Sequence, residues 1–100
     1  MYVTRGDSKT YRVRVKNYEI SEGDFLELTV RNIPSSPEKL IYKKVESHEG
    51  DSFYINFKPQ DTSDLSFGDY VYDVQLTLKG NVYTVIKPSV FTVGTEVSYD

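Results

Sequence analysis

The chain has 100 residues, a formal net charge of −3 at pH 7 and no cysteine. This length suffices for one ordinary hydrophobic core, so we expect a single domain over residues 1–100. The lack of cysteine excludes disulfides, thiolate metal sites and cysteine nucleophiles, and the acidic balance gives no support for nucleic-acid binding. Alanine is absent while β-branched and aromatic residues are abundant, which favours strands over helices.

The first residues, MYVTRGDSKT, contain neither the apolar run nor the cleavage sequence of a signal peptide. No stretch elsewhere approaches the roughly 18 continuous apolar residues that span a membrane. We therefore expect a protein that is made in the cytoplasm and carries no signal peptide or transmembrane segment.

Alternation of apolar and polar residues predicts four strands in the first part of the chain. In the first of them, tyrosine and valine alternate with arginine. The four predicted strands span residues 10–15, 26–31, 40–45 and 53–58. Turns that contain glycine or proline separate them, at residues 22–24, 33–38 and 47–51.

The alternation breaks after the fourth strand. Asp61 has the position of a helix N-cap, with a second acid in the turn that follows, so we predict one short helical turn near residues 59–65. The longest alternating stripe then covers residues 70–78 and predicts a central strand.

A tight hairpin is predicted at Lys79–Asn81, because glycine and asparagine both accept positive φ. It leads into two further strands, at residues 82–86 and 90–93. Pro88 lies between them and marks a bend or a sheet edge.

Seven short strands and one helical turn predict an all-β chain folded as an immunoglobulin-like (Ig-like) antiparallel β-sandwich. Tyr70 has the position of a tyrosine corner, in which the hydroxyl forms a hydrogen bond to the main chain a few residues upstream. Gly68 would give the backbone the freedom to turn there. Alternatively, Tyr70 is only the first core aromatic of its strand. Tyr72 holds the place of a disulfide cysteine of many Ig domains, so packing has to replace the bridge.

The segments Phe57–Leu65 (FKPQDTSDL) and Gly68–Leu76 (GDYVYDVQL) resemble a family of small Ig-like sandwich proteins encoded among phage and prophage structural genes. A related module forms the N-terminal part of some phage baseplate upper proteins. Such sequences often open with Gly-Asp, as at Gly6–Asp7, and close with a strand similar to Val90–Val93. The resemblance covers most of the chain, and Asp61–Leu76 carries nearly all of its specificity.

The resemblance implies a non-enzymatic structural protein, associated with a tail or baseplate, that acts through protein–protein assembly. Its partners would be other virion proteins or further copies of itself, and its location the virion. Longer family members carry a receptor-binding domain and a coiled-coil stalk, for which this sequence has no counterpart after its last predicted strand. The residues suggest no cofactor, no small-molecule substrate, and neither nucleic acid nor membrane as a partner.

No complete catalytic or metal-binding set is visible in the sequence. His48 is the single histidine, so a zinc set or a Ser-His-Asp triad would depend on one turn residue, which we expect to be solvated. Helix capping and a solvated strand face explain Asp61, Asp64, Asp69 and Asp73 better than calcium binding does. A carboxylate pair for glycoside hydrolysis is left open, although so short a chain leaves little room for a sugar cleft.

Two further patterns have simple structural explanations. Arg5–Asp7 spells the tripeptide that integrins bind, but its Gly-Asp serves as the turn before the first strand. Arg12, Arg14 and Lys16 form a basic strand face, to which Lys43–Lys44 add. We expect that face to be solvated rather than to bind phosphate, because the chain is acidic overall.

Tyrosine is the residue type that suggests an interaction surface, with nine in the chain. Tyr54 should point outward from its strand, and tyrosine is enriched in protein interfaces. We predict an interface that includes Tyr54 and an edge strand, because open edges are where sandwiches pair with partners. The alternative function is a carbohydrate- or cell-surface-binding module, which would need a concave aromatic platform on one sheet face.

Overall fold

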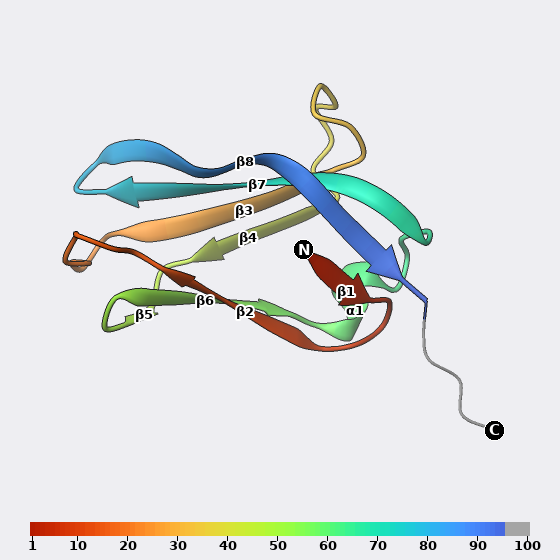
Figure 1. Ribbon diagram of the computed structural model, residues 1–100, viewed down its shortest axis with the longest axis horizontal. Coiled ribbons are helices and arrows are strands. Elements are labelled where there is room, and N and C mark those ends of the chain that lie inside the picture. Colours follow the sequence, from red (N-terminus) through yellow and green to blue (C-terminus); the bar gives the residue numbers. More distant parts are fainter. Residues whose placement is uncertain (96–100) are drawn as a thin grey trace.

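The computed structural model describes residues 1–95 and contains eight strands and one short helix within them. In chain order these are β1 (Tyr2–Thr4), β2 (Lys9–Arg14), β3 (Phe25–Arg31), β4 (Ile41–Val45), β5 (His48–Glu49), β6 (Ser52–Phe57), α1 (Pro59–Thr62), β7 (Gly68–Leu78) and β8 (Asn81–Gly94). The strands form two layers, with α1 at one end of the molecule (Figure 1).

The larger sheet has the order β1-β8-β7-β3-β4 and the smaller sheet the order β2-β6-β5. Neighbouring strands are antiparallel except β1, which runs parallel to the end of β8. In an Ig-like domain, strands B, E and D share one sheet and strands C, F and G the other. The sets β2-β6-β5 and β3-β7-β8 have these neighbours in this chain order, and β4 is added beside β3. The predicted all-β, Ig-like sandwich is therefore confirmed.

The alternating apolar residues of the strands form the core between the sheets. Its fully buried members are Val3, Leu26, Leu28, Val30, Phe53, Ile55, Phe57, Val74, Phe91 and Val93. The ring centres of Phe57 in β6 and Phe91 in β8 are 5.6 Å apart, and Tyr72 packs edge-on against Phe91 at 6.2 Å. The contact between Phe57 and Phe91 joins the two sheets in a domain that has no disulfide, and Tyr72 supports Phe91 from within the larger sheet.

The sequence pattern does not predict β1 or β5, since three and two residues are too few to display an alternation. The predicted strands 82–86 and 90–93 are one continuous strand, β8. Pro88 lies within β8, where the register with β7 shifts. A bulge of this kind tolerates proline, because its missing N–H is not needed by a regular ladder there.

The predicted helical turn is present as α1, but it begins before its expected cap. Pro59 occupies the start of the helix, where its fixed φ is favourable. Asp61 is therefore not the N-cap. Its carboxylate accepts the Lys58 N–H at 2.7 Å from within the first turn and binds the Lys43 ammonium at 2.7 Å. The second contact ties α1 to β4.

The β7–β8 hairpin turns at Lys79 and Gly80, whose φ values are 50° and 80°. The expectation that Asn81 would take positive φ is wrong, because Asn81 is already the first residue of β8 and pairs with Leu78. The Lys79 N–H donates to Asp24 Oδ1 at 2.8 Å. This hydrogen bond holds the lysine in a conformation that a side chain of its kind rarely adopts.

Lys79→Asn should raise the free energy of unfolding by about 0.5–1 kcal/mol, because Asn-Gly suits two consecutive positive φ values better than Lys-Gly. Urea denaturation measures the change. The control is Lys87→Asn on β8, where φ is not positive, and its expected effect is below about 0.5 kcal/mol. A loss of stability in Lys79→Asn would contradict this account of the turn.

Candidate functional site

Tyr70 and Gly68 lie together at the start of β7. The Tyr70 hydroxyl donates to the carbonyl oxygen of Ser66 at 2.7 Å, which is the kind of contact that a tyrosine corner makes. Gly68 has a φ of 139°, in the region that favours glycine. Both residues therefore shape the connection from α1 to β7 and have structural rather than chemical roles.

Tyr70→Phe removes this hydrogen bond and keeps the ring, so we expect the free energy of unfolding to fall by about 1 kcal/mol. Urea denaturation again provides the measurement. The matched control is Tyr54→Phe, whose hydroxyl forms no hydrogen bond to any residue between 1 and 95. Equal losses in the two variants would mean that the Tyr70 hydroxyl contributes nothing to the corner.

Tyr54, the predicted interface residue, lies on β6 opposite Arg12 of β2 and is half-buried. It borders a shallow depression between β4 and β6 that Lys44 and Asn56 also line. Tyr42, an exposed tyrosine of β4, belongs to the other sheet. The two tyrosines therefore do not share one sheet face.

His48 lies on β5 and is half-buried. Its ring packs edge-on against the fully buried Phe53, with 6.0 Å between the ring centres. The expectation of a solvated turn histidine is therefore wrong. The two residues are directly paired across β5 and β6, which explains why His48 packs against the core.

Arg12 and Arg14 share one counter-ion on the outer face of the smaller sheet. Arg14 Nε lies 2.5 Å and Arg12 Nη2 3.4 Å from the carboxylate of Asp51. Hydrogen bonds from Arg14 and Ser52 lower the pKa of the Asp51 carboxyl below its usual 3.8. Lys43–Lys44 lie on β4 in the other sheet, so the expectation that they extend this basic face is wrong.

The aspartates between Asp61 and Asp73 do not converge on one point. Asp69 accepts the Thr92 hydroxyl at 2.7 Å, and Asp73 pairs with Arg31 at 3.6 Å. Each is thus engaged by a different element. Within residues 1–95, no group of three or more histidine or acidic side chains is placed to hold a metal ion.

Arg5–Asp7 connects β1 to β2. The Gly6 N–H donates to Thr62 Oγ1 at 3.0 Å, and the Arg5 guanidinium lies 3.9 Å from the centre of the Phe67 ring. Both contacts hold the segment against α1 and the connection to β7. They support its interpretation as a structural turn.

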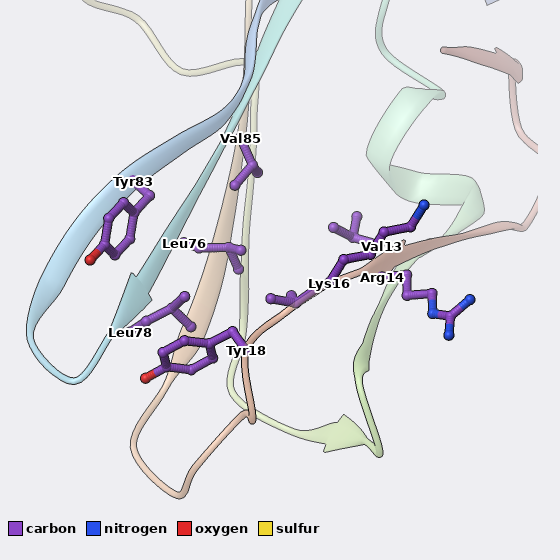
Figure 2. Close-up of a pocket in the computed structure, with 9 residues that line it drawn as sticks. Val13, Arg14, Lys16, Tyr18, Leu76, Leu78, Tyr83 and Val85 are labelled. Atoms are coloured by element: carbon purple, nitrogen blue, oxygen red, sulfur yellow. The ribbon is translucent and has the colours of Figure 1, made fainter.

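A lateral groove opens between the sheets, where β2 and the residues after it face the first half of β8. Its volume is about 360 Å³. Figure 2 shows Leu76, Leu78, Tyr83 and Val85 on the side of the larger sheet and Val13 on the side of the smaller one, with Tyr18 at one end. The leucines are buried, whereas Tyr83 and Val85 are exposed. The lateral groove is therefore an open apolar surface rather than an enclosed cavity.

The lateral groove has two basic residues, Arg14 and Lys16, at its border on β2 and just after it. Figure 2 shows that their side chains extend away from Leu76, Tyr83 and Val85. Arg14 is engaged by Asp51, whereas Lys16 forms no ion pair within residues 1–95. The hydroxyl of Tyr18 is buried without a hydrogen-bond partner in the same part of the chain. Burial and the charge of Asp24 raise the pKa of that hydroxyl.

β8 presents a free edge beside the lateral groove. β1 pairs only with Thr92–Gly94, so in the part of the chain described, residues 81–89 have a strand partner on the β7 side alone. Four large apolar side chains of β8 are between 43% and 62% exposed: Val82, Tyr83, Val85 and Val90. Apolar surface and unpaired backbone thus occur together on one strand.

The alternation pattern predicts a strand at residues 82–86 but does not reveal that its edge stays free. The amino-acid composition of this segment is the one sequence signal that could have indicated an unusual strand. These residues read VYTVI and are apolar on both faces, which is unusual for an antiparallel strand with one solvated face. That signal indicates an unusual strand, yet it does not distinguish a buried strand from an exposed binding edge.

No protein-family model matches this chain, and no curated protein matches it. Within residues 1–95, no helix is long and apolar enough to cross a membrane. The lateral groove and the free β8 edge are therefore the main guides to function.

Proposed function

We propose that this chain is a non-enzymatic structural protein of phage or prophage type that assembles with other proteins through its β8 edge. The observation that carries the proposal is the free edge of residues 81–89 beside the lateral groove. Free strand edges next to exposed apolar side chains are typical of protein-interaction sites. The phage or prophage assignment depends on the resemblance of Asp61–Leu76.

Strand edges that bind nothing are commonly blunted by lysine, proline or a bulge. β8 has a lysine and a proline at Lys87–Pro88, and its register with β7 is irregular from Thr84 to Ser89. Asn81–Thr84 contains neither a charge nor a proline and pairs regularly with β7. This unprotected segment of β8 also borders the lateral groove, which Tyr83 lines. This coincidence favours a binding surface over an edge that is merely solvated.

Co-expression with the products of the neighbouring genes, followed by size-exclusion chromatography with light scattering, tests the proposal. We expect a complex of defined mass with at least one of them, weakened by Tyr83→Lys on β8. The matched control is Tyr42→Lys, because Tyr42 is similarly exposed on β4, at the opposite edge of the same sheet. A strict monomer at every concentration that binds none of these products would contradict the proposal.

Carbohydrate or cell-surface binding is the alternative from the sequence, and it predicts a different result. A glycan array would then be bound, and Tyr54→Ala would abolish that binding while Tyr83→Lys would leave it intact. This outcome would replace assembly as the proposed function.

A further inference from the structure

We propose that Lys43 of β4 is a gatekeeper residue: its inward charge keeps the β4 edge of the larger sheet from pairing with the free β8 edge of a second copy. Without such protection the two edges could join copies head to tail into an open polymer. This inference rests on the proposed function, because it requires a β8 edge that is able to add a strand. It assigns a role to the opposite edge of the same sheet.

The larger sheet has unpaired backbone at both of its sides. Leu78 and Asn81 close the two-residue β7–β8 hairpin as a hydrogen-bonded pair. Pairs alternate along an antiparallel ladder, so the N–H and C=O groups of Val82 and Thr84 point away from β7. In the part of the chain described, β4 pairs with β3 alone, and its other side is also unpaired. Two open edges in one sheet are the condition for edge-to-edge association.

Lys43 lies on the inner face of β4, where an apolar residue is expected. It pairs with the fully buried Leu28 of β3, and its neighbours on the same face are Ile41 and Val45. Its ammonium binds the Asp61 carboxylate of α1 at 2.7 Å. β4 thus directs a charge into the space between the sheets. An inward-pointing charge is one of the features by which natural sheets protect an edge strand.

The physical basis of this protection is the cost of removing an ion pair from water. The side chains of Lys43 and Asp61 keep 21% and 17% of their surface exposed. A strand added beside β4 would cover this remaining surface, and complete burial of two charges has a large desolvation cost. Lys44 differs in this respect, because it lies on the outer face and its side chain is 43% exposed.

The β1 edge is closed in a different way. The Tyr2 N–H group donates to the Tyr11 hydroxyl at 3.0 Å, and that hydroxyl donates to the Tyr2 carbonyl oxygen. The Thr4 carbonyl oxygen accepts the N–H group of Asp7 at 3.1 Å. These backbone groups of β1 are therefore occupied and not available to an added strand. Protection at β1 as well as at β4 favours a feature of the fold over the chance placement of one lysine.

Light scattering of the full chain over about a hundredfold range of concentration tests the inference. The variant Lys43→Val/Asp61→Asn removes the inward charge and leaves no carboxylate unpaired. The new amide oxygen is still able to accept the Lys58 N–H group. We expect this variant to form species larger than a dimer that grow with concentration, whereas the wild type alone forms none.

Two further variants show which edges are involved. Lys44→Val is the matched control, because it removes an exposed lysine from the outer face of the same strand, and we expect it to behave as the wild type. Tyr83→Lys, added to Lys43→Val/Asp61→Asn, places a charge on the β8 edge opposite the buried Leu76 and should abolish the growth. Aggregation of a poorly folded variant would not be abolished in this way.

Thermal melting checks that the variants fold. If Lys43→Val/Asp61→Asn does not melt cooperatively, Lys43→Gln takes its place in the same comparison, because it removes the charge and keeps a polar partner for Asp61. A folded variant with the mass of the wild type at every concentration would overturn the inference. Growth that persists with Tyr83→Lys, or growth of the wild type beyond a dimer, would also overturn it.

These outcomes are separate from the test of the proposed function. A complex with a neighbouring gene product, combined with no growth of the Lys43 variant, overturns the gatekeeper role and leaves assembly through β8 standing. Growth of the variant without any such complex supports the gatekeeper role and overturns the proposed function.

Discussion

Phe91→Ala is expected to lower the free energy of unfolding by about 4 kcal/mol. Phe91 is fully buried, and its ring centre lies 5.6 Å from that of Phe57 on the opposite sheet. Truncation removes a large apolar side chain and opens a cavity between the sheets. Because natural domains are stable by only about 5–15 kcal/mol, urea denaturation should show a midpoint far below that of the wild type.

The matched control for this change is Phe67→Ala. Phe67 is 47% exposed and packs under the guanidinium of Arg5, so its truncation should cost about 1 kcal/mol or less. If both variants lost the same stability, Phe91 would not lie in the core. The description of how the two sheets pack would then be wrong.

Asp24→Asn should have the second large effect, since the Asp24 side chain is buried and holds two segments together. Its Oδ1 accepts the Lys79 N–H and its Oδ2 accepts the Ser21 N–H, each at 2.8 Å. The carboxylate thus joins the loop before β3 to the β7–β8 turn. The asparagine has only one acceptor oxygen, so one N–H group is left unsatisfied. We expect the melting temperature near neutral pH to fall by more than about 5 °C.

The pH dependence of that difference tests its cause. Hydrogen bonds from the N–H groups of Lys79 and Ser21 lower the pKa of the Asp24 carboxyl below its usual 3.8. A carboxyl with a lowered pKa stabilises the fold above its unfolded-state pKa, and this contribution is lost as the pH falls through its folded-state pKa. The difference between wild type and Asp24→Asn should therefore be largest near neutral pH and shrink below about pH 4.

Asp51, whose pKa is also lowered, gives the wild type and the variant the same additional pH dependence. The quantity that tests the role of Asp24 is therefore the difference in melting temperature between the two proteins at each pH. The pH dependence of either protein alone also contains the contribution of Asp51. Asp64→Asn, at an exposed aspartate, is the control and should have the same melting temperature as the wild type at every pH. A difference for Asp24→Asn that does not change with pH would contradict the role assigned to its charge.

The fold could largely be predicted from local pattern, because period-two alternation depends only on which side of each strand meets the core. Leu26, Leu28 and Val74 lie inside as their alternation indicates. The details that escaped prediction depend on contacts distant in sequence. Lys79 has positive φ because Asp24 accepts its N–H, and His48 packs against the core because its strand partner is Phe53.

The candidate site could not be predicted for the same reason. Residues 82–86 have the composition of a strand with two covered sides, but only the topology shows that β1 pairs with Thr92–Gly94 alone and does not cover their edge. The lateral groove requires Val13 and Leu76, from opposite sheets, to approach the same space. Tyr54, chosen from its outward phase, lies on the predicted strand, β6, but it lines a different depression from this groove.

The central claim is that partners bind along Asn81–Ile86 of β8. Amide hydrogen exchange of the full chain, measured alone and in complex with the neighbouring gene product that binds it, tests this most directly. We predict that the amides of Val82 and Thr84 exchange more slowly in the complex, because an added strand would accept their N–H groups. Unchanged exchange at these two amides, with new protection at Tyr54 and its neighbours on β6, would contradict the claim.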